Sequence, residues 1–495
     1  MSLLKKLASQ TAYYGLSSVV GRLLNYLLVP FHTGVFSTEA YGIVSDFYAH
    51  AALLQILFVY GMETTFFQFV AHKKQDLRET FSLILTRLIV SSGIFFVILW
   101  YAADGISAWM GYPEKGMFVR WFGCILVFDT LAMLPFARLR LEGKARRFAF
   151  LKLGQILLTV LLNIGFLYLL PKAITSERWA FLSPLYVADL GLGYVFLSNL
   201  IANGLLLVWL LPHFRGFYWR WSWAKFSPMW RYAYPLIFTG IAYTINEVAD
   251  RSLLKYLLPE GFYAGLSTLD AVGVYSGCYK LSIFITLAVQ AFKYAAEPFF
   301  FAQAAERDSP QTFARLMRYF VIACAGMIVL VSAELRLLQV VFLRQPAYAQ
   351  GLVVVPFLLF ANTFLGMYYN LSVWFKVTDR TYYGTWISLI GMGVTLLLNV
   401  LLIPHLGYLG SAIATFACYL TMALVCYLWG QRFYPIPYPV GAVMGYLGLA
   451  AVLSAVAFGV AFAQFWVDQV FRLGILGIFV GVVWQGEKKR AIPDT

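Results

Sequence analysis

The sequence predicts an all-α polytopic membrane protein with about fourteen transmembrane helices. The first observation behind this prediction is composition: 61% of the 495 residues are hydrophobic and only 12% are charged. Soluble domains are roughly 45–50% apolar and about 25% charged. So little charge cannot cover the surface of a water-soluble protein of this length, which excludes a soluble enzyme, a disordered protein and a coiled coil.

The second observation is a series of apolar runs, each close to the ~20 residues that a helix needs to cross the hydrocarbon core. No connection between them is long enough to form a folded extramembrane domain. The last run is short. The predicted spans are 11–30, 41–62, 81–103, 117–137, 149–170, 187–211, 233–258, 272–300, 317–338, 352–374, 384–403, 409–429, 441–463 and 470–484.

The third observation is the distribution of 37 Lys and Arg against 23 Asp and Glu, a formal charge of +14. Most of the basic residues fall in alternate connections and at both ends of the chain. Since Lys and Arg collect in cytoplasmic loops, both termini are predicted to be cytoplasmic. The N-terminal run has the length of a full span and lacks a small-residue cleavage site, so a retained helix is expected instead of a signal peptide.

Internal similarity predicts two six-helix lobes. RLLNYLLVP (22–30) is similar to RSLLKYLLP (251–259), EAYGIVSDFYA (39–49) to DAVGVYSGCYK (270–280), and TVLLN (159–163) to TLLLN (395–399). An even number of helices per copy gives parallel repeats related by a pseudo-two-fold axis along the membrane normal, as in many transporters. The expected domains are an N-lobe at 1–212, a cytoplasmic linker at 213–231, a C-lobe at 232–430, and two extra helices with a basic tail at 431–495.

The linker segment RGFYWRWSWAKFSPMWRYAY (215–234) interleaves basic and aromatic residues. This pattern can mark a nucleic-acid surface. In a membrane protein, however, Trp, Tyr and Arg are typical of the headgroup level. We therefore interpret the segment as an amphipathic linker and expect no nucleic-acid partner.

Six basic residues lie inside predicted spans and are not explained by topology. Burying a cation at mid-membrane costs at least ~2.5–3.5 kcal/mol, so each needs a reason. Structural ion pairs, such as Glu247 with Arg251 and Lys293 with Glu297, explain part of the set. As substrate-binding candidates we select Arg22, Arg251, Lys255, Lys280 and Lys293; Arg87 is expected to extend toward the interface. As ion-coupling or cation-orienting candidates we select Glu247, Asp250, Glu297, Asp46 and Asp129.

A cationic cavity in a membrane predicts an anionic substrate, because the guanidinium fork and the lysine ammonium both bind phosphate. No phosphate-loop or metalloprotease motif occurs, and the five cysteines and five histidines are dispersed. We therefore expect no catalytic residues, no metal site, no cofactor and no ATP hydrolysis within this chain. Energy would come from a Na⁺ or H⁺ gradient, the membrane potential or the substrate gradient.

Several segments resemble bacterial polysaccharide-export flippases of the multidrug/oligosaccharidyl-lipid/polysaccharide exporter superfamily. They are LASQTAYYGLSSVVGRLLNYLLVPFHTGVFSTEAYGIVSDFYA (7–49), ADRSLLKYLLP (249–259), the stretch 272–300 and NVLLIPHLGYLGSAIAT (399–415). The resemblance implies a fourteen-helix inner-membrane protein that moves polyprenyl-diphosphate-linked oligosaccharides by alternating access. A polysaccharide polymerase and glycosyltransferases would be its partners.

Three alternatives stay open at this point. Relatives that flip the peptidoglycan precursor use arginines on helix 1 and near helix 8; Arg22 matches the first by position, whereas helix 8 has Lys280 and Lys293. A cation-coupled multidrug exporter of the same superfamily is the second alternative. A membrane glycosyltransferase or polymerase is the third, from another class of protein.

Overall fold

The computed structural model describes residues 19–175, 183–184, 186–303, 309–378 and 380–491. Within these ranges the secondary structure is helical and contains no strand. The chain forms two compact units. Unit 1 comprises Met1–Leu28 and Asp46–Thr244, and unit 2 comprises Val29–Ser45 and Ile245–Thr495. The all-α prediction is confirmed.

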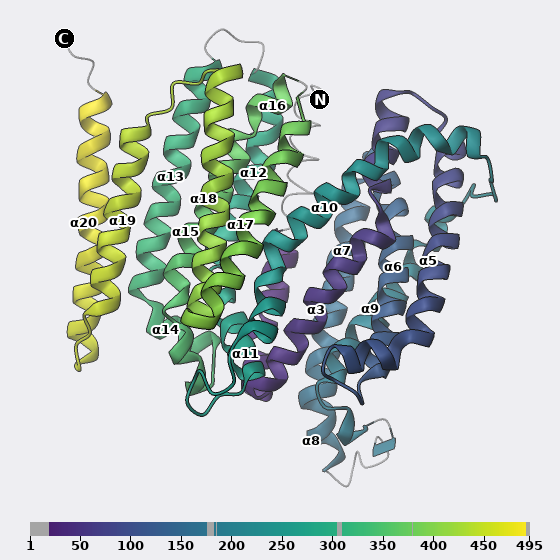
Figure 1. The fold of residues 1–495 in the computed structure, drawn as a ribbon, viewed down its shortest axis with the longest axis horizontal. Helices are drawn as coiled ribbons and strands as arrows, with labels where there is room; N and C mark the ends of the chain where they lie inside the picture. Colours follow the sequence, from purple (N-terminus) through teal and green to yellow (C-terminus); the bar gives the residue numbers. More distant parts are fainter. Residues whose placement is uncertain (1–18, 176–182, 185, 304–308, 379, 492–495) are drawn as a thin grey trace. The chain divides into compact units, whose positions relative to one another are not determined.

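Unit 1 is built from long membrane helices joined by short connections (Figure 1). A break at Tyr60 and Gly61, both with positive φ (34° and 72°), separates the first two of them. The helices are α3 (Thr38–Val59), which begins in unit 2, α4 (Met62–Phe67), α5 (Leu77–Trp109), α6 (Gly116–Leu141), α7 (Ala145–Ile164), α8 (Leu170–Ile174) and α9 (Gly193–Leu210), with π-helical turns at Gln68–His72 and Gly165–Leu169.

Unit 2 contains the second half of the chain together with the short helix α2 (Leu28–Val35). Helix α10 (Trp223–Leu257) begins in unit 1 and ends in unit 2. The others are α11 (Thr268–Lys280), α12 (Ile283–Gln303), α13 (Ser309–Ala333), α14 (Leu335–Phe342), α15 (Val354–Leu371), α16 (Val373–Val377), α17 (Tyr382–Leu406), α18 (Tyr408–Phe433), α19 (Val440–Gly459) and α20 (Phe465–Ala491).

The core of unit 2 is the packing of α15 and α17 against α18. Trp374, 1% exposed, donates from its indole N–H to the carbonyl of Cys426 at 3.1 Å. The last two helices, α19 and α20, pack beside α13 (Figure 1). Glu487 of α20 accepts hydrogen bonds or ion pairs from Tyr446 (2.8 Å) and Arg318 (3.2 Å), which fixes the added pair to the rest of the unit.

Eleven helices in the described part of the chain are long and apolar enough to cross a membrane, or twelve if the bent pair α11 and α12 is one span. Two of the fourteen predicted spans are not among them. The first, 11–30, begins outside the described residues, and its described part, 19–30, is mostly helical. The seventh, 233–258, does form a helix as part of α10, but α10 is not among the helices that are apolar enough to cross a membrane. The count of fourteen stays a prediction.

The predicted span 272–300 is not one straight helix. It breaks between Lys280 and Ile283 with a bend of 48°. At the break the N–H groups of Leu281 and Ser282 bond three residues back, at 3.0 Å each, in place of four. The Ser282 hydroxyl donates to the carbonyl of Tyr279 (2.8 Å) and accepts from Asn362 (3.2 Å). A side chain that competes for helix carbonyls in this way explains the bend.

Candidate substrate-binding and coupling site

The main polar cluster of unit 2 lies on adjacent residues of α10. Asp250 is 2% exposed, and one carboxylate oxygen accepts the hydroxyl of Tyr275 at 2.5 Å. The other accepts the backbone N–H of Arg251 at 2.8 Å and lies 3.6 Å from the Arg251 guanidinium. These partners fix the Asp250 carboxylate beside the Arg251 guanidinium.

The Arg251 side chain is 12% exposed and is oriented from two further directions. It donates to the backbone carbonyl of Glu247 at 3.0 Å, and its guanidinium carbon lies 4.3 Å from the centre of the Tyr279 ring. Glu247 shares the helix face as predicted, but the hydrogen bond goes to its main chain and its side chain is exposed. A guanidinium has five N–H donors, so this arrangement fixes the group and leaves donors for an anion.

The three predicted lysines of unit 2 lie on α10, α11 and α12. Lys255 on α10 is half-buried, with its ammonium 5.4 Å from the Tyr256 ring. Lys293 on α12 is also half-buried, 4.6 Å from the Tyr369 ring. Lys280 ends α11 and is exposed. Glu297 lies on α12 but outside the side chains that the structure describes. Aromatic rings near each of the two half-buried lysines stabilise a cation without removing its charge.

One turn before Asp250, Asn246 ties α10 to its neighbours. Its amide donates to the carbonyl of Ser388 (3.1 Å) on α17 and accepts from Thr395 (3.2 Å) on the same helix. Tyr419 on α18 donates to the Asn246 carbonyl at 3.3 Å. These bonds fix the turn of α10 that presents Asp250 and Arg251.

Unit 1 holds a second buried carboxylate. Asp46 on α3 is fully buried and accepts the hydroxyl of Tyr112 at 2.9 Å. The Nδ1 atom of His50, one turn further along α3, is 3.1 Å from the Asp46 carboxylate and 2.9 Å from its carbonyl. The indole of Trp109 packs edge-on to the His50 ring. The Asp46 carboxylate thus lies beside a histidine, the type of side chain that ordinarily changes charge between about pH 5 and 8.

The remaining predicted residues of unit 1 are separate from this pair in the contacts that the structure gives. Arg22 lies in the helical residues before α2 and is exposed. Asp129 on α6 is half-buried and interacts electrostatically with Lys152 of α7. Lys152 also begins a chain of side-chain hydrogen bonds that crosses α7, α9 and α3, in the order Lys152, Gln155, Asn203, Asn199 and Tyr48.

A close helix contact involves the residues of the predicted repeat. Gly42 of α3 and Gly273 of α11, equivalent by the sequence alignment of 39–49 with 270–280, face each other. A Cβ on Gly42 would overlap the carbonyl oxygen of Leu269, and one on Gly273 would overlap that of Thr38. Only glycine permits this approach of the two backbones.

Hydrogen bonds continue the close packing around Gly42 and Gly273 along residues 33–41. The Thr38 hydroxyl donates to Asp270, which also completes a capping box with Ser267 at the start of α11. Thr33 donates to the carbonyl of Phe342 at 2.9 Å, and Gln345 donates to the carbonyl of Phe36. The first turns of α3 and the residues before it are therefore bound to α11 and to the chain after α14.

Sequence reasoning missed the aromatic and histidine partners of these charges, which are Tyr275, Tyr279, Tyr369, Tyr112 and His50. Tyr275 and Tyr279 are four residues apart on α11, so both can face one side of that helix. The spacing of these two tyrosines was the signal in the sequence that could have identified them as partners of Arg251 and Asp250. The Asp46–His50 spacing is the same and was equally visible in the sequence.

Buried charge on membrane helices, a helix broken within a span and a glycine contact between repeat-equivalent segments are features of a membrane transporter. Comparison with solved structures finds a similar fold in membrane transporters. The structure of the lipid II flippase MurJ in an inward closed conformation aligns with a TM-score of 0.65 at 12% identity, covering 95% of this chain and 98% of that one. A variant of the Vibrio cholerae MATE transporter VcmN aligns with a TM-score of 0.60 at 15% identity, covering 87% and 97%.

The outward-facing structure of a multidrug resistance MATE family transporter of the MOP superfamily aligns with a TM-score of 0.59 at 12% identity, covering 89% and 96%. At these identities the likeness is one of fold. Residues 7–303 match the family described as polysaccharide biosynthesis protein. The chain belongs to this family, and the predicted superfamily is confirmed. No curated protein matches the sequence.

Proposed function

We propose that this protein is a secondary flippase that moves polyprenyl-diphosphate-linked oligosaccharide units across the bacterial inner membrane for surface polysaccharide synthesis. The observation that carries the proposal is Arg251, a guanidinium fixed on α10 by Asp250, by a backbone carbonyl and by the Tyr279 ring. A pre-oriented guanidinium binds a diphosphate through paired N–H donors. Lys255, Lys280 and Lys293 of the same unit add point charges for the second phosphate.

The glycine contact supports alternating access. In the predicted topology, with both termini in the cytoplasm, Gly42 and Gly273 lie toward the outer side of the membrane. We assign this contact to the state that is closed to the outside, and release of the substrate requires α3 and α11 to separate there.

Coupling is assigned to Asp46 with His50. Gly42 and Asp46 are one turn apart on α3, so a change of charge at the Asp46 carboxylate acts one turn away from the closed contact. To Asp250 we assign the other role that the sequence suggested, the orientation of Arg251, because its carboxylate lies 3.6 Å from the guanidinium. Proton uptake from outside would then favour separation of α3 from α11. The alternative is a cycle coupled to Na⁺, which the translocation assay described next distinguishes from coupling to H⁺.

The experiment is a leaflet-accessibility assay in proteoliposomes, with a fluorescent polyprenyl-diphosphate oligosaccharide whose sugar is cleaved by an externally added glycosidase. Arg251→Gln and Arg22→Gln should reduce translocation at least tenfold while the proteins remain inserted and monodisperse, and Arg251→Lys should retain part of the rate. Arg432→Gln, which changes an exposed arginine in the last turn of α18, is the matched control and should be unaffected. Full activity of both Arg251→Gln and Arg22→Gln contradicts the proposal.

The same assay tests the alternatives. Faster translocation of the peptidoglycan lipid precursor than of an oligosaccharide-linked lipid identifies the second flippase class, which the fold likeness to MurJ favours. Efflux of organic cations without lipid movement identifies a multidrug exporter. Sugar transfer by the purified protein without translocation identifies a glycosyltransferase or polymerase; otherwise those enzymes are the proposed partners.

A further inference from the structure

The chain between α9 and α10 lies along the start of α5 in an extended conformation. The side chain of Arg78 donates to the carbonyl of Gly216 at 2.8 Å. The N–H of Tyr218 donates to the Ser82 hydroxyl (3.3 Å), and that of Arg220 to the Thr86 hydroxyl (3.2 Å). Every second residue of the extended segment thus meets every fourth residue of the helix, because two extended residues and one helical turn both advance about 6 Å.

This hydrogen-bonded segment lies at the end of α5 that carries the basic connections. Helix α5 has 33 residues and is about 50 Å long, whereas the hydrocarbon core is about 30 Å thick. Helix α5 is therefore longer than the hydrocarbon core is thick. We take its stretch from Arg78 to Arg87, which the segment covers, as the part that extends beyond the core. By the distribution of basic residues this end faces the cytoplasmic leaflet.

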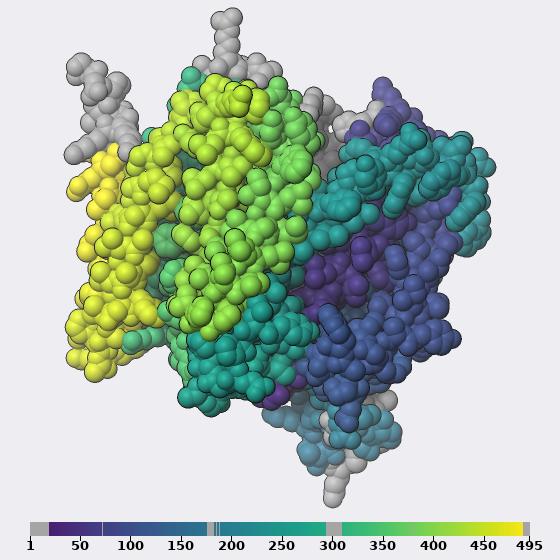
Figure 2. All heavy atoms as spheres, viewed as in Figure 1, coloured from purple at the N-terminus to yellow at the C-terminus, as the bar shows by residue number. Residues whose placement is uncertain are grey.

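Three tryptophans project from the segment at every second position. Trp219 and Trp221 are each 64% exposed and Trp223 is 59% exposed. Trp221 also stacks on the guanidinium of Arg87, whose carbon lies 3.4 Å from the ring centre. The segment and the start of α10, both teal, lie at the surface of unit 1 (Figure 2). A row of exposed indoles at this level has the chemistry of an interfacial aromatic belt.

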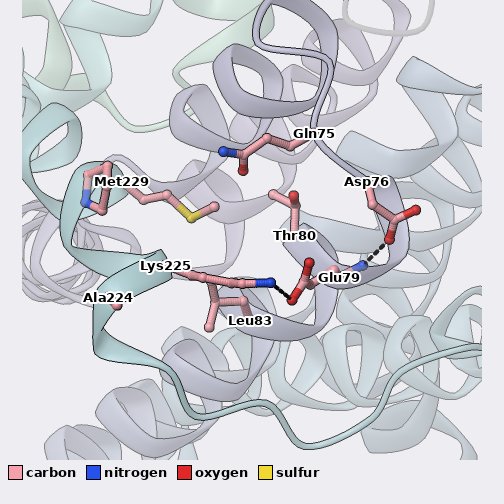
Figure 3. A pocket seen from close by; sticks show the side chains of 9 residues that line it. Gln75, Asp76, Glu79, Thr80, Leu83, Ala224, Lys225 and Met229 are labelled. Atoms are coloured by element: carbon pink, nitrogen blue, oxygen red, sulfur yellow. Dashed lines mark hydrogen bonds and ion pairs between the residues drawn. The ribbon is translucent and has the colours of Figure 1, made fainter.

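The charge around this row is strongly positive. The three connections of unit 1 on this side, 63–79, 138–152 and 215–231, contain thirteen basic and four acidic residues. Among the acids, Glu79 pairs with Lys225 at 2.5 Å, as seen in the pocket between α5 and α10 (Figure 3), and with Arg220 at 3.2 Å. Glu142 pairs with Arg138 and Lys144. Arg215 and Arg231, at the two ends of the segment, are exposed.

We infer that residues 215–231 form a docking surface for anionic phospholipids of the cytoplasmic leaflet. The indoles of Trp219, Trp221 and Trp223 enter the boundary between headgroups and acyl chains, and Arg215 and Arg231 bind lipid phosphates beside them. Charge complementarity selects this occupant, because anionic headgroups attract basic residues next to a membrane. The surface is independent of the translocated substrate and positions the segment that leads into α10.

A spin label at Trp219→Cys measures its depth in nanodiscs that contain phosphatidylglycerol. Cys124 is the one native cysteine that is not buried, so its replacement by Ala leaves a suitable background. Labels at Val97, exposed in the middle of α5, and at Lys74, exposed in a connection, give the lipid and water references. We expect accessibility to a water-soluble nickel reagent at position 219 to lie between the two. Accessibility equal to that at Lys74 overturns the inference and indicates a protein partner.

The charge is tested by native mass spectrometry of the full chain with equimolar phosphatidylglycerol and phosphatidylcholine. We expect Arg215→Gln/Arg231→Gln to lower the ratio of bound phosphatidylglycerol to phosphatidylcholine by about fivefold per charge removed. The matched control is Lys115→Gln/Lys172→Gln in the connections of the opposite side, which should not change the ratio. An unchanged ratio in the first pair, or an equal fall in both pairs, contradicts the inference.

Discussion

The two units use the same pair of side chains, a buried aspartate and a tyrosine hydroxyl, with different third partners. In unit 2, Asp250 accepts from Tyr275 and lies beside Arg251. In unit 1, Asp46 accepts from Tyr112 and lies beside His50. Arginine stays charged at every accessible pH, whereas histidine changes charge near neutrality. The same motif therefore gives unit 2 a permanent charge pair and unit 1 a pair that can respond to pH.

This difference separates two roles that the sequence placed in one set of charged residues. A fixed guanidinium suits the binding of a phosphate, because its orientation does not depend on the state of the cycle. A protonatable pair suits coupling. We therefore expect substitutions of the Asp250–Arg251 pair to change stability and substrate binding, and substitutions of the Asp46–His50 pair to change mainly the dependence on pH.

The largest effect is expected at Asp250. Asp250→Ala removes the carboxylate and leaves Arg251 without its neighbouring charge, at a cost of about 3–5 kcal/mol for a buried pair. Thermal unfolding in detergent measures the loss. The double variant Asp250→Asn/Arg251→Gln removes both charges and should recover part of the stability. Equal stability of Asp250→Ala and wild type would mean that the pair is not buried in the membrane.

The next largest effect is expected at the contact between Gly42 and Gly273 in unit 2. Gly42→Ala places a methyl group against the backbone of α11, which cannot rotate away, and an overpacked contact costs about 1–3 kcal/mol. The cysteine pair Thr38→Cys/Asp270→Cys should then form a disulfide more slowly in the Gly42→Ala background. Gly93→Ala is the control, since nothing lies within 4 Å of its added Cβ. Unchanged cross-linking would show that the contact already opens freely.

In unit 1, His50→Gln keeps a hydrogen-bonding side chain and removes the titration. Histidine ordinarily changes charge between about pH 5 and 8, and the His50 ring lies 3.1 Å from the Asp46 carboxylate. Between about pH 5 and 8 we expect translocation by the wild-type protein to vary and that by His50→Gln to be flatter. Arg251→Lys should retain the wild-type dependence on pH. Identical pH profiles of His50→Gln and wild type would exclude this histidine from coupling.

The sequence predicted the helices well because hydrophobic length is a local property. Eleven of the predicted spans correspond to helices of the structure that are long and apolar enough to cross a membrane. In another predicted span, 272–300, α12 begins where Ser282 interrupts the apolar run. The Ser282 hydroxyl also accepts a hydrogen bond from Asn362, which is 80 residues away and cannot be inferred from the run itself.

For the candidate site, the sequence placed the charged residues on their helices but not their partners. Glu247 was paired with Arg251 by spacing, yet the guanidinium bonds the Glu247 carbonyl and lies nearer to Asp250. Asp250 and Arg251 are adjacent, and neighbours in sequence do not share a helix face by the rule of three or four. The contact arises because the Asp250 carboxylate also accepts the backbone N–H of Arg251, which spacing does not predict.

The smallest effect is expected at Glu142, an ion-paired acid outside the membrane. Partial burial acts to raise its pKa, but hydrogen bonds from Lys144 (2.6 Å) and Arg138 (2.7 Å) outweigh it and hold the pKa below the ordinary value. Its stabilisation is therefore present above the ordinary pKa of about 4.3 and is lost as pH falls through the lowered value.

Glu142→Gln should cost about 0.2–1 kcal/mol at neutral pH, because exposed pairs are weak, and less in acid. Comparison of unfolding temperatures at neutral and acidic pH, each against wild type, measures this difference. A loss as large as that of Asp250→Ala would remove the distinction between a pair buried in a membrane unit and a pair in water. A loss that grows in acid would mean that the Glu142 carboxylate is not what Lys144 and Arg138 stabilise.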